Sequence, residues 1–184
     1  SKKLQTKINN IIPEKVHEAI TTAIKQMIKA VLFGAELTSS KTERVKSLEL
    51  SEAVIREKIE TYKKTAAAEG GITGAGGILM AFADFPLLIG IKIKMLFDIA
   101  GKYGFDTSDY KERVFLLHIF QLSFSSQEHS KKVFMQMRNW KEKAKELPEN
   151  INDFDWRNFQ QEYRDYIDLA KMAQLIPIIG AAVG

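Results

Sequence analysis

The sequence contains no cysteine, which excludes a disulfide framework and any metal site built on thiolates. Histidine is scarce, and no two of His17, His118 and His129 are separated by three or four residues, the spacing that a helical metal-binding pair needs. No serine lies in a Gly-x-Ser-x-Gly motif, so acyl transfer has no support. We therefore expect no metal, no cofactor and no catalytic group, and we interpret His118 as a hydrogen-bonded core histidine.

A strong charge of one sign is also missing. The chain has 27 Lys and Arg against 23 Asp and Glu, and the two signs alternate along most of it, which argues against nucleic-acid binding. The basic N-terminus is not followed by an apolar segment, so a secretory signal is not expected and a cytoplasmic location is the default. An apolar content of 45% excludes disorder and allows a substantial core.

The apolar residues recur mostly at helical spacing, and strand propensity never dominates. We predict an amphipathic helix from Pro13 to Leu32, followed by a polar linker, so that residues 1–45 precede the main body. Further helices are expected from Ser47 or Ser51, from Phe85 or Pro86 to Lys102, after Asp106, over 128–147 and over 153–175. The fold class is therefore all-α: a helical bundle in a single domain, 1–184, with two Gly/Ala-rich apolar helical elements.

The first Gly/Ala-rich element spans residues 70–83 and has no charged residue. It contains Gly70, Gly71, Gly74, Gly76 and Gly77. The run has no lysine, which excludes a phosphate-binding P-loop, and it follows a helical segment, which excludes a dinucleotide fingerprint. As a helix it places small residues four apart, an arrangement that allows helices to approach closely. It covers about 14 residues, or about 21 Å, which is too short to cross about 30 Å of bilayer hydrocarbon. Two alternatives stay open: a buried hairpin of a soluble bundle, or a re-entrant hairpin in a membrane.

The second element is the run 175–184, which includes Pro177 and Gly180. Because two small-residue faces gain from close backbone approach, we predict that the two elements lie beside each other. The chain ends inside this run without a polar residue, and we expect that it is truncated there.

Charged residues flank the first element. Asp84 is expected to cap the helix that begins beside Pro86. Lys94 and Asp98 lie four residues apart and are expected to pair. If the element contacts a membrane, Ile78 and Leu79 are the apolar candidates, and the lysines that would face the lipid headgroups are Lys92, Lys94 and Lys102.

Four aromatic residues in the C-terminal third, Trp140, Trp156, Tyr163 and Tyr166, have helical spacing and are expected in the core. Trp140 is the best candidate for a membrane-interface residue, because Lys141, Lys143 and Lys145 follow it.

Several motifs occur together in one order: Gly71-x-x-Gly74-x-Gly76-Gly77, Asp84-x-Pro86, Tyr103-Gly104-Phe105-Asp106 and the terminal Gly/Ala run. From about Leu48 onward the sequence thus resembles the EcsC family of bacterial proteins. The resemblance implies an accessory protein whose gene lies beside those of an ABC transporter's ATPase and permease, with no defined catalytic activity.

We therefore expect a membrane-associated accessory or interaction protein, peripheral on the inner face of the bacterial membrane, with lipid and ABC transporter subunits as its partners. Two other classes stay open. One is a lipid-active or otherwise hydrolytic enzyme, which would bring polar side chains together in a cleft. The other is a soluble carrier of apolar ligands, which would contain an apolar tunnel.

Overall fold

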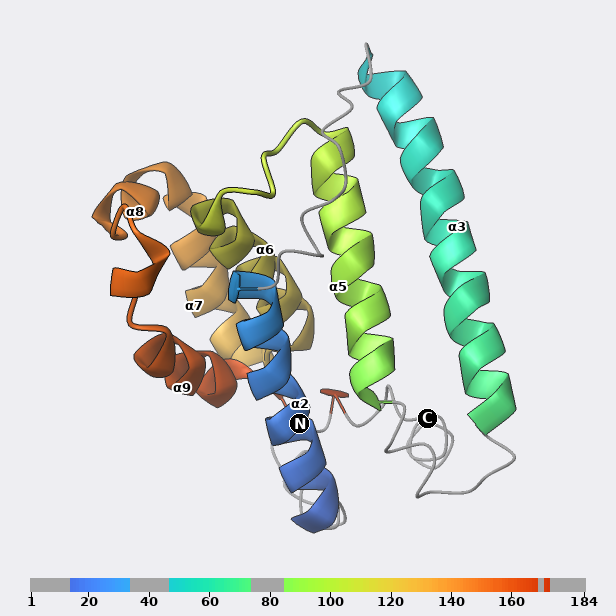
Figure 1. The fold of residues 1–184 in the computed structure, drawn as a ribbon, viewed down its shortest axis with the longest axis horizontal. Coiled ribbons are helices and arrows are strands. Elements are labelled where there is room, and N and C mark those ends of the chain that lie inside the picture. Colours follow the sequence, from blue (N-terminus) through green and yellow to red (C-terminus); the bar gives the residue numbers. More distant parts are fainter. Residues whose placement is uncertain (1–13, 34–46, 74–84, 169–170, 173–184) are drawn as a thin grey trace.

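The computed structural model describes residues 14–33, 47–73, 85–168 and 171–172 (Figure 1). The elements in these ranges are helical, and the extended pairing among them is a single isolated bridge between Ser125 and Ile167. The all-α prediction is confirmed. The helices are α2 (Glu14–Phe33), α3 (Leu48–Thr73), α5 (Phe85–Lys102), α6 (Tyr110–Phe124), α7 (Gln127–Arg138), α8 (Trp140–Glu146), the 3-10 helix η3 (Ile151–Asp153) and α9 (Trp156–Tyr166).

Helix α2 is amphipathic, as its sequence predicts. Its buried stripe packs against α5, α6 and α9, while Lys25 and Lys29 remain exposed on the other side. The stripe consists of Ile20, Ala23, Ile24, Met27, Ile28, Val31 and Leu32. Burial of this apolar surface is what holds α2 in the body of the molecule.

Helix α5 packs between α3 and the helices α2 and α6. Its buried residues follow helical spacing from Phe85 through Ile89 and Ile93 to Phe97. Helix α3 runs antiparallel to α5 at the edge of the molecule (Figure 1), and α5 is its main neighbour among the described residues. The two helices form an antiparallel pair, which we call the α3–α5 hairpin.

Local sequence signals account for most of the helix ends. The Ser47 hydroxyl accepts a hydrogen bond from the Leu50 amide at 3.2 Å, so the first of the two predicted caps for α3 is the one used. The Asp109 carboxylate caps α6 in the same way, and Ser126 caps α7. These side chains satisfy backbone amides that have no partner within the helix.

The helix predicted over 128–147 is wrong as a single element. It breaks at Asn139 (φ −104°, ψ 29°) into α7 and α8. The break changes the direction of the chain, so that Trp140 packs on Phe115 and His118 of α6. Phe134, which lies on α7 before the break, is 54% exposed. The packing of Trp140 on α6 therefore accounts for the boundary between α7 and α8.

The helix predicted over 153–175 is also too long, because α9 ends at Tyr166. Ile167 is extended and forms the bridge with Ser125, and the Asp168 amide donates to the Phe124 carbonyl at 2.8 Å. The end of α9 is thus tied to the end of α6, which is remote in sequence.

Candidate functional site

Much of the predicted site lies outside the described residues. Gly70 and Gly71 belong to the last turn of α3. The prediction that the two Gly/Ala-rich elements lie side by side, and the capping role of Asp84, fall outside the described ranges, as do Gly74, Gly76, Gly77, Ile78, Leu79, Asp84, Pro177 and Gly180.

The part of α5 nearest the glycine-rich segment has an exposed apolar face. Pro86 is exposed, Leu87 is 49% exposed, and a methyl group placed on Gly90 would meet no atom within 4 Å. Further along the helix, Lys94 is exposed, whereas Lys92 and Lys102 are half-buried. The first two turns of α5 therefore present apolar surface where the α3–α5 hairpin meets residues 74–84.

The Tyr103-Gly104-Phe105-Asp106 motif forms the turn from α5 to α6. Gly104 has φ 86°, a left-handed conformation that glycine adopts without strain. The Phe105 amide donates to the Ala100 carbonyl at 3.0 Å and the Gly104 amide to Gly101 at 3.1 Å, the two hydrogen bonds of a Schellman motif. Within the described residues, this motif has an architectural role.

Asp106 completes the same turn. Its Oδ1 accepts hydrogen bonds from the Ser108 hydroxyl at 2.6 Å and the Ser108 amide at 2.9 Å. These hydrogen bonds hold the pKa of the Asp106 carboxyl below its usual value. The carboxylate is therefore a turn-stabilising acceptor at the start of the segment that leads into α6.

A polar contact joins the two helices of the hairpin. Asp98 Oδ2 accepts hydrogen bonds from Tyr62 OH at 2.7 Å and from Lys58 Nζ at 3.0 Å. The sequence predicts a partner for Asp98 within its own helix, at Lys94, whereas the structure shows an ion pair with α3. Burial, followed by the hydrogen bond to Asp98, raises the pKa of Tyr62 well above its usual value. This cluster fastens α3 to α5.

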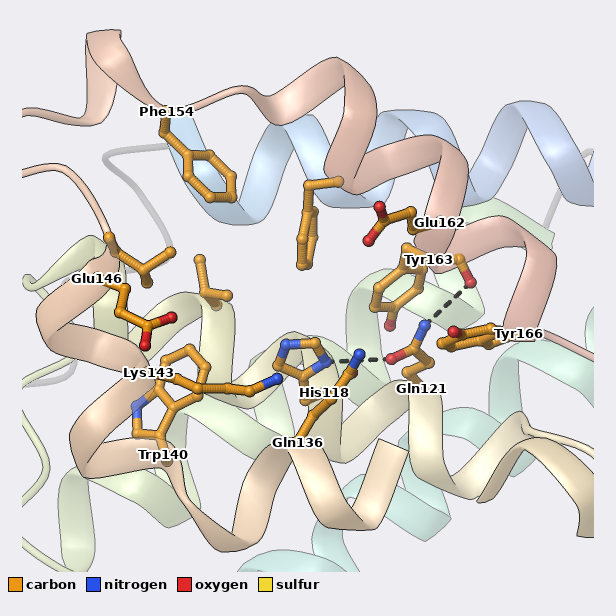
Figure 2. Close-up of a pocket in the computed structure, with 13 residues that line it drawn as sticks. His118, Gln121, Gln136, Trp140, Lys143, Glu146, Phe154, Glu162, Tyr163 and Tyr166 are labelled. Carbon is orange, nitrogen blue, oxygen red and sulfur yellow. Dashed lines mark hydrogen bonds between the residues drawn. The ribbon is translucent and has the colours of Figure 1, made fainter. Parts of the chain in front are cut away.

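A second site was not anticipated from the sequence. A cleft of about 320 Å³ opens between α6, the α7–α8 segment and the η3–α9 segment (Figure 2). Its volume lies in the range of small-molecule sites. The lining combines apolar and aromatic side chains with polar ones. The apolar and aromatic residues are Val114, Trp140, Leu147, Phe154, Phe159, Tyr163 and Tyr166, and the polar residues are His118, Gln121, Gln136, Lys143, Glu146 and Glu162.

His118 lies in this cleft with a defined tautomer. The buried Gln121 Nε2 donates to the Tyr163 carbonyl at 3.1 Å, which turns Gln121 Oε1 toward His118 Nδ1, also at 3.1 Å. Because Oε1 can only accept, Nδ1 carries a hydrogen and Nε2 of the neutral ring keeps its lone pair. Figure 2 shows this second nitrogen directed away from Gln121, toward the open part of the cleft.

Burial lowers the pKa of His118 below its usual value. The hydrogen bond that His118 donates to Gln121 opposes this shift, and the charge of Lys143 adds to it. The prediction of a hydrogen-bonded core histidine is therefore only half right: the ring packs between Trp140 and Phe159, but one of its two nitrogens has a partner among the described residues.

Three of the four predicted core aromatics, Trp140, Tyr163 and Tyr166, line the cleft. Tyr163 is buried, and its hydroxyl donates to the Leu117 carbonyl at 2.7 Å. Trp140 and Trp156 pack against the core and are partly buried. The Trp140 indole nitrogen is buried without a hydrogen-bond partner in the described structure. Trp140 thus leaves an unused donor in the cleft wall, a feature that usually has a cost of about 1–3 kcal/mol.

Comparison with known proteins decides the family. The sequence model of the EcsC protein family matches residues 1–184. This chain belongs to the EcsC family. It is 48% identical to protein EcsC of Bacillus subtilis (strain 168), over 100% of this chain and 75% of that protein. It is also 26% identical to the uncharacterized protein YdbA of the same organism, over 89% of this chain and 61% of that protein. No solved structure matches it significantly.

The EcsC match extends the resemblance seen in the sequence, because it includes α2 and the residues before Leu48. Across the described ranges, no helix is long and apolar enough to cross a membrane. The same ranges contain no cluster of three or more His, Asp or Glu side chains arranged to hold a metal ion.

Proposed function

We propose that this protein is a membrane-associated accessory protein of an ABC transport system, and that it contacts lipid through the glycine-rich end of the α3–α5 hairpin. The observation that carries the proposal is the exposed apolar face of Pro86, Leu87 and Gly90 on α5. In the sequence, this face follows the segment 74–83, which has no charged residue, with Asp84 between them. An apolar helix end beside an uncharged segment is what an interfacial membrane contact requires.

Apolar insertion should contribute more to this contact than charge. Transfer of one leucine-sized side chain out of water contributes about 1.5–3 kcal/mol. A lysine near an acidic lipid surface contributes about 1 kcal/mol. Lys94 is exposed, but Lys92 and Lys102 are half-buried, so few lysine charges of α5 can reach headgroups freely. The link to transporter subunits, and hence the inner face of the membrane, rests on the family resemblance of the sequence.

The hydrolytic alternative has weaker support. Polar side chains do converge on the His118 cleft, but none of the residues that line it is a serine, threonine or cysteine. Among the described residues, the cleft therefore brings no Ser, Thr or Cys nucleophile beside the histidine. The cleft gives more support to the ligand-carrier alternative.

Liposome flotation of the full chain tests the proposal. With vesicles that contain phosphatidylglycerol, the parent should float, and increased salt should weaken its binding only modestly. Leu87→Asp should weaken binding strongly, and the double variant Ile78→Asp with Leu79→Asp should abolish it at any salt concentration.

Leu48→Asp is the matched control, because Leu48 is 66% exposed and begins α3 at the opposite end of the hairpin (Figure 1). It should float like the parent. Failure of the parent to float, or equal losses for Leu48→Asp and Leu87→Asp, would refute the assignment of the lipid contact to this end.

A further inference from the structure

The cleft around His118 has an apolar wall and two polar groups without a partner among the described residues, Lys143 Nζ and His118 Nε2. Phe154 and Phe159 line the cleft from the η3–α9 segment, with their ring centroids 5.5 Å apart. Figure 2 shows Lys143 extending from α8 toward His118. Lys143 has no ion pair with any residue in the described ranges, although its neighbour Lys145 pairs with Glu142 at 2.9 Å. A free ammonium beside aromatic surface is suited to a ligand that is both acidic and apolar.

The acidic residues of the cleft lie at its rim. Glu162 is exposed and accepts a hydrogen bond from Asn158 Nδ2 at 3.2 Å, and Glu146 is exposed on α8. The charge of Lys143 adds to the effect of burial in lowering the pKa of His118. Tyr163 also lines the cleft, and burial raises its pKa well above the usual value. A positive charge therefore lies close enough to His118 to affect its protonation.

We propose that this cleft binds a small amphiphilic carboxylate, with its carboxylate between Lys143 Nζ and His118 Nε2 and its hydrocarbon part against Phe154, Phe159 and Val114. One carboxylate oxygen pairs with the ammonium. The other accepts a hydrogen bond from Nε2 once that nitrogen has taken a proton from solvent. Nδ1 continues to donate to Gln121 in both protonation states, so the ring does not have to turn.

Binding of such an anion is coupled to proton uptake. In the free protein, burial and Lys143 favour the neutral ring. A carboxylate next to Nε2 favours the protonated ring, so the pKa of His118 rises on binding. Affinity should consequently be higher at pH 6 than at pH 8. This inference does not depend on the proposed membrane contact, which lies on another part of the molecule.

Octanoate, used below its aggregation concentration and without vesicles, is a suitable probe. Isothermal titration calorimetry of the full chain at pH 6 should give saturable binding with one site. Lys143→Met keeps most of the unbranched side chain but removes its charge, and should weaken binding about tenfold to hundredfold, as expected for loss of a charged hydrogen bond. Lys141→Met is the matched control on the same helix: Lys141 is exposed and does not line the cleft, so binding should stay within about twofold.

Two further measurements separate this site from nonspecific apolar binding. The neutral alcohol 1-octanol should bind at least tenfold more weakly than octanoate and should not respond to Lys143→Met. Titrations in two buffers of different ionisation enthalpy should show proton uptake with the parent and not with His118→Gln. Absence of saturable octanoate binding at pH 6, equal affinity of Lys143→Met and Lys141→Met, or binding without proton uptake would each overturn the proposal.

Discussion

Asp98 should contribute strongly to the stability of the α3–α5 hairpin. The carboxylate side chain is 11% exposed, and the side chain of its partner Lys58 is 37% exposed. The second partner, Tyr62, donates from α3 at 2.7 Å. Because these partners lie on the neighbouring helix, substitution of Asp98 perturbs the packing of α3 on α5 as well as α5 itself.

The magnitude follows from the two contacts. The pair with Lys58 is partly solvated, so we assign it about 0.2–1 kcal/mol. The hydrogen bond from Tyr62 to a largely buried charged acceptor contributes about 1.5–3 kcal/mol. Asp98→Ala should thus lower the free energy of unfolding by about 2–4 kcal/mol, and Tyr62→Phe by about 1.5–3 kcal/mol.

Urea unfolding of both single variants and of the double variant measures these losses and the coupling between them. Tyr62→Phe should cost little in the Asp98→Ala background, because its acceptor is already absent. Hydrogen exchange should accelerate in α3 more than in α6, since α3 packs mainly on α5 and can open locally.

The control for this experiment is Lys63→Met. Lys63 pairs with Glu60 at 2.7 Å, but both side chains are at least 60% exposed, so the loss should lie within the error of the urea measurement. Additive losses for Tyr62→Phe and Asp98→Ala, or a loss for Asp98→Ala as small as that for Lys63→Met, would show that the Asp98 cluster does not hold the two helices together.

Two further predictions concern single residues. Gly90→Ala should raise the free energy of unfolding by about 0.5–1 kcal/mol in urea melts, because the helical site has open space for a methyl group, and a destabilised variant would mean that Gly90 is closely covered. His118→Gln should reduce the loss of stability that the parent shows between pH 8 and pH 5. Because the pKa of His118 is lowered in the folded protein, the unfolded chain binds the proton first as the pH falls. The parent is therefore most stable above the unfolded pKa of histidine and loses stability as the pH falls below it. Parallel pH profiles of parent and variant would contradict this reasoning.

The best sequence-based predictions concern features that depend on a few neighbouring residues. The predicted limits of α5 agree with the structure, because Pro86 cannot continue a preceding helix and Gly104 adopts the left-handed conformation that ends one. The buried stripe of α2 was predicted for a similar reason: its apolar residues recur every three or four positions, and such a face must be covered.

Predictions fail where distant contacts compete with local propensity. Nothing near Asn139 prevents one continuous helix over 128–147, yet the chain breaks there and Trp140 packs on α6. Helix α9 ends at Tyr166 because Ile167 pairs with Ser125, which lies more than forty residues earlier. A single sequence shows neither partner, so its periodicity overestimates the length of both helices.

The candidate sites also divide into features that the sequence predicts and features that only the tertiary structure shows. By itself, the sequence determined the all-α class, the EcsC family motifs and the turn formed by Tyr103-Gly104-Phe105-Asp106, since these depend on periodicity and local backbone geometry. Only the tertiary structure decided that His118, Lys143 and Phe159 line one cleft and that Asp98 pairs with Lys58. The physical reason is that a binding cleft or an interhelical ion pair forms between elements that are remote in sequence, and their relative positions are set by packing of the whole core.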